Sequence, residues 1–142
     1  SLAAIKKAKV MFPKIRFIKG DLINERPLPG EYFDLVVVKE SLDYFYHKLT
    51  QFLDNAVSLL RENGSLYISQ PFPKVEKWFG QEVVDGPEKL KDILSRYAEP
   101  IHYSVQWDWN FNGRPFVHFL GKKNEDKEGS GNNFAMGKCR IR

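Results

Sequence analysis

The chain has 142 residues, enough for one domain with its own hydrophobic core. Its net charge of +4 comes from basic side chains scattered among acidic ones, so we expect neither a nucleic-acid-binding surface nor more than a weak general attraction to anions. The single cysteine allows no disulfide framework or cysteine metal site, no apolar run approaches the roughly 20 residues of a membrane span, and nothing resembles a signal peptide, so the sequence predicts a cytoplasmic protein without a metal site or membrane partner.

The first third of the chain predicts a helix and two strands. Residues 2–11 have the apolar spacing of the last turns of a helix, which Pro13 ends. The apolar run Ile15–Ile18 predicts a short strand. After a loop rich in proline and glycine, Phe33–Val38 predicts a second strand. Its uninterrupted apolar core indicates burial on both faces, as in a parallel sheet covered by helices.

The middle of the chain predicts a strand–helix–strand crossover. Apolar residues between Tyr46 and Glu62 recur at i, i+3, i+4 and i+7, which is typical of an amphipathic helix. Asn63-Gly64 provides the left-handed residue that commonly ends a helix. A buried strand over Ser65–Ser69 follows directly, so the strand that begins at Phe33 and this strand are expected to be parallel.

The last third predicts a helix, an antiparallel hairpin and a tail. Pro87 suits the first position of a helix. Strands at Ile101–Trp109 and Pro115–Gly121 flank a turn containing Asn112-Gly113, so the sheet should end in a hairpin. Beyond this point the residues are polar and aperiodic. We therefore expect one partial domain over residues 1–123 and a disordered polar tail over residues 124–142.

Small polar clusters follow the first two predicted strands. Gly20-Asp21-Leu22 follows the first strand, and Lys39-Glu40-Ser41 follows the second. In open α/β sheets, ligands bind just beyond the carboxyl ends of parallel strands. No glycine-rich phosphate or cofactor loop precedes these strands. The pattern is therefore that of the back half of a cofactor-binding domain.

Three motifs carry a resemblance to a known family. They are Gly20-Asp21-Leu22, Phe33-Asp34-Leu35-Val36 and the junction from Leu59 to Leu66, and the closing hairpin ending in Lys122-Lys123 agrees with them. Together they resemble class I S-adenosylmethionine-dependent methyltransferases, the seven-stranded Rossmann-like group. The resemblance implies an α/β three-layer sandwich in which a parallel sheet is closed by a C-terminal antiparallel hairpin. This chain would lack the first strands of that fold, and S-adenosylmethionine would be the cofactor of the complete domain.

The resemblance also assigns cofactor-binding residues. Asp21, beside Gly20, would accept a hydrogen bond from the adenine amino group, because a carboxylate only accepts, and the Leu22 backbone N–H would reach a ring nitrogen. Asp21 is alternatively a turn residue stabilised by its own backbone. Lys39-Glu40-Ser41 would surround the methionine end of the cofactor. Glu40 alternatively supplies negative charge to the start of the following helix.

The acceptor site is less defined. The family builds it from variable segments, here Tyr44–His47 and residues 72–84, so Tyr44, His47 and Phe72 are the substrate-pocket candidates, although Tyr44 suits simple packing equally well. No catalytic residue is identified. A general base among the three histidines remains open, since histidine titrates near neutrality. Asp34 is expected to be structural.

One further group of aromatic residues leaves several alternatives open. Trp107, Trp109 and Phe111 alternate along one predicted strand and therefore share one of its faces. They would cover the last helix, form an oligomer contact through the C-terminal hairpin, or stack on an acceptor.

These features predict the C-terminal part of a methyltransferase that acts on a small-molecule acceptor. The chain alone is expected to be inactive, because the family's first strand, with its glycine-rich turn, and the acidic residue after the second strand are absent from it. An alternative is a non-catalytic fragment or interaction module that retains the fold. A third hypothesis is another Rossmann-like enzyme that acts with a nucleotide sugar or nicotinamide. The closing antiparallel hairpin favours the methyltransferase over this hypothesis.

Overall fold

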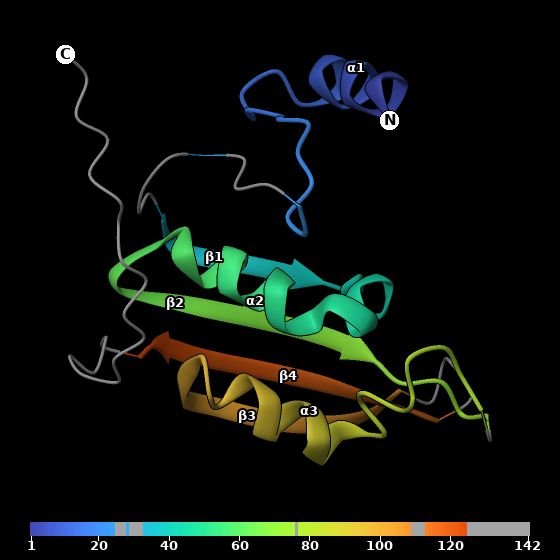
Figure 1. The fold of residues 1–142 in the computed structure, drawn as a ribbon. Helices are drawn as coiled ribbons and strands as arrows, with labels where there is room; N and C mark the ends of the chain where they lie inside the picture. Colours follow the sequence, from blue (N-terminus) through green and yellow to red (C-terminus); the bar gives the residue numbers. More distant parts are fainter. Residues whose placement is uncertain (25–27, 29–32, 76, 109–112, 125–142) are drawn as a thin grey trace, which may run out of the picture.

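Four strands form one mixed sheet in this computed structural model, which describes residues 1–24, 28, 33–75, 77–108 and 113–124 (Figure 1). In the order in which they lie across the sheet, the strands are β1 (Phe33–Lys39), β2 (Leu60–Pro71), β4 (Arg114–Lys123) and β3 (Ala98–Asp108). β1 and β2 are parallel, whereas β4 is antiparallel to both β2 and β3. This confirms the predicted parallel portion closed by an antiparallel hairpin.

The crossover between β1 and β2 contains two short helices. A 3₁₀ helix η1 (Leu42–Lys48) leads into α2 (Leu49–Ser58). The helix expected to reach Glu62 is therefore shorter than predicted, because β2 already begins at Leu60. Asn63 does adopt the left-handed conformation, with φ 62, but within β2, where the register against β1 shifts.

The core lies between one face of the sheet and the helices that cover it. α3 (Pro87–Leu94) connects β2 to β3, and Figure 1 shows that α2 and α3 lie side by side on the same face. The four strands, η1, α2 and α3 contribute the apolar side chains on their inward faces. The largest fully buried ones are Phe52, Phe72, Phe119, Leu42, Leu53, Leu60, Leu66, Ile68, Leu90, Leu94, Val84 and Val117.

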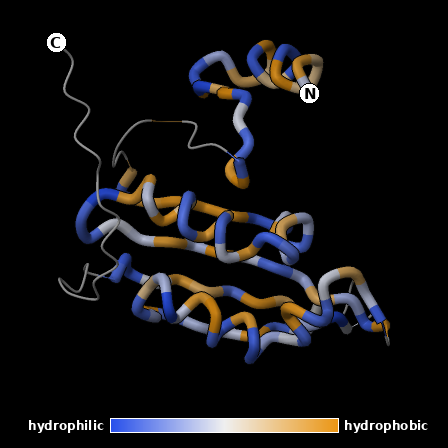
Figure 2. Tube along the Cα trace, in the orientation of Figure 1, coloured by the Kyte–Doolittle hydropathy of each residue, from blue (hydrophilic) through white to orange (hydrophobic). Residues whose placement is uncertain are grey.

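The opposite face of β1 is open in the described chain. Leu35 and Val37 are 49% and 54% exposed, although Figure 2 shows β1 as a largely hydrophobic strand. The expectation that β1 is buried on both faces is therefore wrong for these residues. The physical reason is that the described helices in contact with the sheet, α2 and α3, pack on the other face.

The N-terminal segment lies apart from the sheet. α1 (Leu2–Met11) is capped by Ser1, whose hydroxyl accepts a hydrogen bond from the Ala4 N–H, and none of its residues is buried. The predicted strand at Ile15–Ile18 is wrong, since these residues form no strand and both ends of the run are exposed. A strand needs a neighbour for its backbone groups, and none lies beside this run among the described residues.

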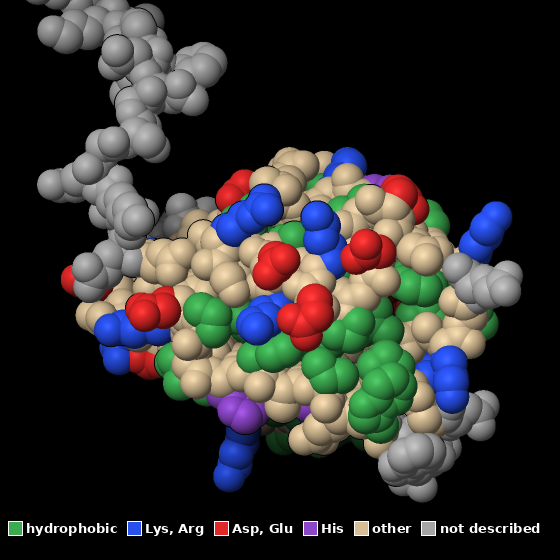
Figure 3. All heavy atoms as spheres, turned by 90° about the horizontal axis from the view of Figure 1, so that it is seen from below, with side chains coloured by type: hydrophobic (Ala, Val, Ile, Leu, Met, Phe, Trp, Pro, Cys, Tyr) green, Lys and Arg blue, Asp and Glu red, His purple; other side chains and the backbone are tan. Residues whose placement is uncertain are grey.

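The β3 edge of the molecule carries exposed apolar side chains among mixed charges (Figure 3). Ile101 and Trp107 on β3 are 61% and 57% exposed, so Trp107 does not cover α3 as core packing would require. Trp109, Phe111 and residues 125–142, including nearly all of the predicted tail, lie outside the described residues. An oligomer contact through the hairpin therefore stays a prediction. Within the described chain, no helix has the length and apolar character needed to cross a membrane.

Candidate functional site

The carboxyl end of β1 holds an unusual backbone turn. The Glu40 N–H donates to the Ser69 carbonyl at 2.7 Å, so pairing with β2 continues one residue beyond the strand. Glu40 then adopts φ 51, in the left-handed region that costs a non-glycine residue roughly 1–2 kcal/mol. Such strained residues cluster at functional sites. Lys39 and Glu40 form an exposed ion pair with Nζ and Oε1 3.6 Å apart.

A buried amide fixes the residues that follow this turn. Gln70 is 2% exposed, and its Oε1 accepts a hydrogen bond from the Leu42 N–H at 2.9 Å. Its Nε2 donates to the Pro71 carbonyl at 3.1 Å. Ser41 occupies the first position before η1 without capping it through its side chain. The segment from Glu40 to Leu42 is therefore tied to the end of β2.

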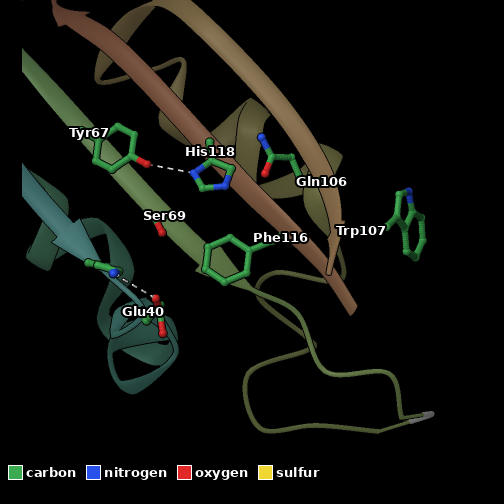
Figure 4. Close-up of a pocket in the computed structure, with 8 residues that line it drawn as sticks. Glu40, Tyr67, Ser69, Gln106, Trp107, Phe116 and His118 are labelled. Atoms are coloured by element: carbon green, nitrogen blue, oxygen red, sulfur yellow. Dashed lines mark hydrogen bonds and ion pairs between the residues drawn. The ribbon is translucent and has the colours of Figure 1, made fainter. Parts of the chain in front are cut away.

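A groove of about 550 Å³ lies beside this turn, on the open face of the sheet (Figure 4). Tyr67 and His118 form a hydrogen bond across it, with the Tyr67 hydroxyl 2.8 Å from His118 Nδ1. The rings of Phe116 and His118 stack with their centroids 5.1 Å apart. The groove is lined by Lys39, Glu40, Tyr67, Ser69, Gln106, Trp107, Phe116 and His118.

Strand alternation and register bring the groove residues together. Tyr67 and Ser69 are two positions apart on β2, and Phe116 and His118 are two positions apart on β4, so each pair points to one face. Ser69 lies opposite His118 in the antiparallel register. Sequence reasoning identified Lys39 and Glu40 for this place but missed most of the lining. The available signal was a set of polar residues at alternating positions in a strand that looked buried.

A second cavity of about 460 Å³ joins the two segments predicted to form an acceptor pocket. η1 contributes Tyr44 to its lining, and the connection after β2 contributes Trp78 and Phe79. His47 lies beside it, with Nδ1 3.2 Å from Glu82 Oε1 and its ring edge-on to Phe79. The complete lining is Asp43, Tyr44, Tyr46, Pro71, Pro73, Trp78 and Phe79.

Phe72 lies elsewhere from the other two substrate-pocket candidates. It is 2% exposed within the hydrophobic core, and neither of the two cavities includes it in its lining. Its backbone N–H donates to the Pro115 carbonyl at 2.9 Å, which ties the end of β2 to the start of β4. Phe72 is therefore placed to pack in the core and not to contact a ligand in either cavity.

The Asp21 carboxylate bonds to its own loop. It accepts hydrogen bonds from the Ile23 N–H at 2.9 Å and from Asn24 Nδ2 at 2.7 Å, and these bonds, the backbone one foremost, lower the pKa of Asp21. Leu22 is joined to α2 by a hydrogen bond from Asn55 Nδ2 to its carbonyl at 2.7 Å. Asp21 therefore stabilises its own turn, as the alternative interpretation expected. Its carboxylate is also exposed and ionised, and hydrogen bonding to adenine stays a prediction.

Tyr46, which lines the second cavity, makes the stability of the folded chain pH-dependent. It is 2% exposed, and burial, with a smaller contribution from the charge of Asp43, raises the pKa of Tyr46 above its usual value. The protonated phenol is therefore favoured in the folded state, and this stabilisation is complete below the unfolded pKa of about 10 and lost as the pH rises above it.

We expect Tyr46→Phe to flatten the alkaline loss of stability. Chemical denaturation at pH 8 and pH 11 should show a smaller fall in the free energy of unfolding for the variant than for the parent chain, with a difference of up to about 1.4 kcal/mol per pH unit above pH 10. Tyr44→Phe is the matched control, because Tyr44 is 77% exposed. An equal fall in the parent and in Tyr46→Phe would contradict the assignment.

Comparisons with known proteins agree with this geometry. Residues 1–68 match the family model for the methyltransferase domain. No curated protein matches the chain.

Within the part of the chain that the structure describes, no cluster of three or more His, Cys, Asp and Glu side chains could hold a metal ion.

Solved structures share the fold at low sequence identity. The N-methyltransferase NodS from Bradyrhizobium japonicum WM9 is 19% identical, with a TM-score of 0.68 over 88% of this chain and 70% of NodS, and it is also known in complex with S-adenosyl-L-homocysteine. A TehB-like SAM-dependent methyltransferase from Corynebacterium glutamicum is 21% identical, with a TM-score of 0.61 over 87% of this chain and 65% of the other. The [4+2]-cyclase SpnF is 10% identical, with a TM-score of 0.56 over 85% of this chain and 60% of SpnF.

Proposed function

The chain has part of the fold of class I S-adenosylmethionine-dependent methyltransferases, and we propose that it is the carboxyl-terminal part of such an enzyme, acting on a small-molecule acceptor. The observation that carries the proposal is the strained turn at Glu40, which lies at the carboxyl end of a parallel strand beside a groove. In open α/β sheets this is the place where ligands bind. The groove volume of about 550 Å³ falls within the range of small-molecule sites.

The comparisons support methyl transfer but do not establish the chemistry by themselves. The family model covers the segment from α1 into β2, and NodS binds the demethylated product of the cofactor. SpnF, whose name describes a cyclase, shares the same fold, so the fold alone hosts more than one reaction. The proposal therefore depends on the residues at the strand ends.

The residues present suit both ends of S-adenosylmethionine. The cofactor supplies an electrophilic methyl group on a sulfonium. Asp21, whose lowered pKa keeps it ionised at neutral pH, would accept a hydrogen bond from the adenine amino group, and the Leu22 N–H would serve a ring nitrogen. The carboxylate of Glu40 would face the methionine ammonium. The main task of these residues is to position donor and acceptor and to exclude water.

The test is methyl transfer by a longer protein that includes the residues encoded before Ser1. We expect those residues to contain a strand ending in an acidic-x-Gly-x-Gly turn, and we expect labelled methyl groups from S-adenosylmethionine to appear in the small-molecule fraction of a cell extract. Label in protein or RNA alone would overturn the small-molecule proposal. A start codon immediately before Ser1, with no transfer, would favour the non-catalytic interaction module, for which the exposed Leu35 and Val37 would provide an apolar surface.

A further inference from the structure

We propose that the reacting group of the acceptor enters the groove beside Glu40, that His118 is its general base, that Tyr67 positions His118, and that the acceptor is a planar ring bearing a hydroxyl group. The proposal rests on the methyltransferase function proposed above. Its physical basis is the hydrogen bond in the groove between Tyr67 on β2 and His118 on β4, which are 51 positions apart in the sequence.

The two ring nitrogens of His118 have different surroundings. Nδ1 lies 2.8 Å from the Tyr67 hydroxyl. Among the described residues, no hydrogen bond is found for Nε2. Figure 4 shows the imidazole between Tyr67 and Gln106, with the second nitrogen on the Gln106 side, and Gln106 lines the groove as His118 does. A substrate in the groove would therefore meet Nε2.

The role we assign to Tyr67 is to hold the proton of the neutral imidazole on Nδ1, through the 2.8 Å contact between that nitrogen and the Tyr67 hydroxyl. A phenolic oxygen accepts as well as donates, so an Nδ1–H donating to Tyr67 leaves the lone pair of the neutral imidazole on Nε2. That lone pair takes the proton from the acceptor hydroxyl while the hydroxyl oxygen forms a bond to the methyl carbon. Bound S-adenosylmethionine would supply the methyl group, and the electron pair of its carbon–sulfur bond would pass to sulfur and leave a neutral thioether. His118 ends as an imidazolium that still donates from Nδ1 to Tyr67.

The aromatic walls indicate the shape of the acceptor. The rings of Phe116 and His118 are stacked at 5.1 Å with an interplanar angle of 22°. Trp107 also lines the groove, but its ring points away from these two in Figure 4. Flat rings pack favourably on such surfaces. A hydroxyl is a weak nucleophile until it loses its proton, whereas a neutral amine attacks without a base. A base in the groove therefore favours a hydroxylated ring.

Other titratable groups around His118 decide the design of the controls. Tyr67 on β2 contacts it directly, and the Lys39–Glu40 ion pair lines the same groove from the end of β1. On β3, Ser104 lies opposite His118 in the register, and its hydroxyl is 3.2 Å from His102 Nε2. His102 is exposed and outside the groove lining, so it is the matched histidine control.

The first experiment uses the 142-residue chain and needs no cofactor. Ring-nitrogen NMR should show His118 as the Nδ1–H tautomer, and Tyr67→Phe should abolish this preference while leaving His102 unchanged. Catechol should shift the resonances of Phe116 and His118, whereas cyclohexane-1,2-diol, which has the hydroxyls without a flat ring, should not. An Nε2–H tautomer in the parent chain would overturn the assignment of the base. Equal effects of the two diols would overturn the assignment of a planar ring to the acceptor.

The second experiment measures methyl transfer to a catechol by the longer protein. His118→Gln should lower kcat by about 10²-fold and remove the acidic limb of the pH profile, with KM changed little. Tyr67→Phe should lower kcat less and shift that limb, and His102→Gln should leave the profile unchanged. His118→Asn and a thermal unfolding curve for each variant separate catalysis from folding. Full activity of His118→Gln would overturn the assignment of His118 as the general base.

The two proposals fail in different ways. If the longer protein transfers methyl groups to no acceptor, the methyltransferase function fails, whatever the tautomer of His118. If it methylates an acceptor while His118→Gln retains the parent rate and pH profile, the methyltransferase function stands and the base is wrong.

Discussion

Replacing Gly80 with alanine is expected to lower the free energy of unfolding by about 3 kcal/mol. Gly80 has φ +83, where an L-residue is strained, and an added Cβ would lie 2.5 Å from Tyr46 Cδ2 and 2.6 Å from Tyr46 Cβ. Tyr46 is itself buried, so it has little room to move. Backbone strain and overpacking therefore act together. Urea denaturation followed by tryptophan fluorescence measures the change.

Gly86→Ser is the control for this substitution. No atom lies within 4 Å of the position of an added Cβ at Gly86, and its φ of 168 is extended backbone that any residue adopts. Serine also suits its place as the residue before α3. We expect a change below about 0.5 kcal/mol. A similar change in both variants would contradict the predicted strain at Gly80 and the predicted clash of an added Cβ with Tyr46.

Local patterns were sufficient to predict most of the sheet. β1 and β2 were identified from short apolar runs joined by an amphipathic helix, and the hairpin from alternation around a turn. Each of these signals lies within a short segment, and the elements then pair with neighbours that the chain itself supplies. Lys39 and Glu40 could be placed beside a ligand site for the same reason, because they follow a strand directly.

Features that depend on distant partners could not be predicted. The run Ile15–Ile18 has the composition of a strand, but a strand also needs an adjacent one, and the described chain provides none. The pairing of Tyr67 with His118 depends on the register between β2 and β4, which the amino-acid pattern leaves undetermined. The early end of α2 likewise follows from pairing, since Leu60 already lies opposite Phe33 on β1.

The 142-residue chain by itself is expected to bind S-adenosylmethionine with a dissociation constant above about 1 mM, which leaves less than about 4 kcal/mol of binding free energy. The glycine-rich turn that holds the methionine end in the resembling family is absent from this sequence. Asp21 and Glu40 lie on different segments, and the N-terminal one is not part of the sheet. Isothermal titration calorimetry of the chain measures the affinity.

The longer protein proposed above, which would include residues encoded before Ser1, provides the comparison for this measurement. It should bind micromolar S-adenosylmethionine, and Asp21→Asn in it should weaken binding about tenfold or more, the usual effect of losing a charge-assisted hydrogen bond. Asp34→Asn is the matched control, because Asp34 pairs with Arg61 at the amino end of β1, away from the carboxyl ends of the strands. Micromolar binding by the 142-residue chain alone would contradict the prediction. The residues from Gly20 to Ser41 would then form a sufficient cofactor site, and the strands proposed to precede Ser1 would serve folding rather than binding.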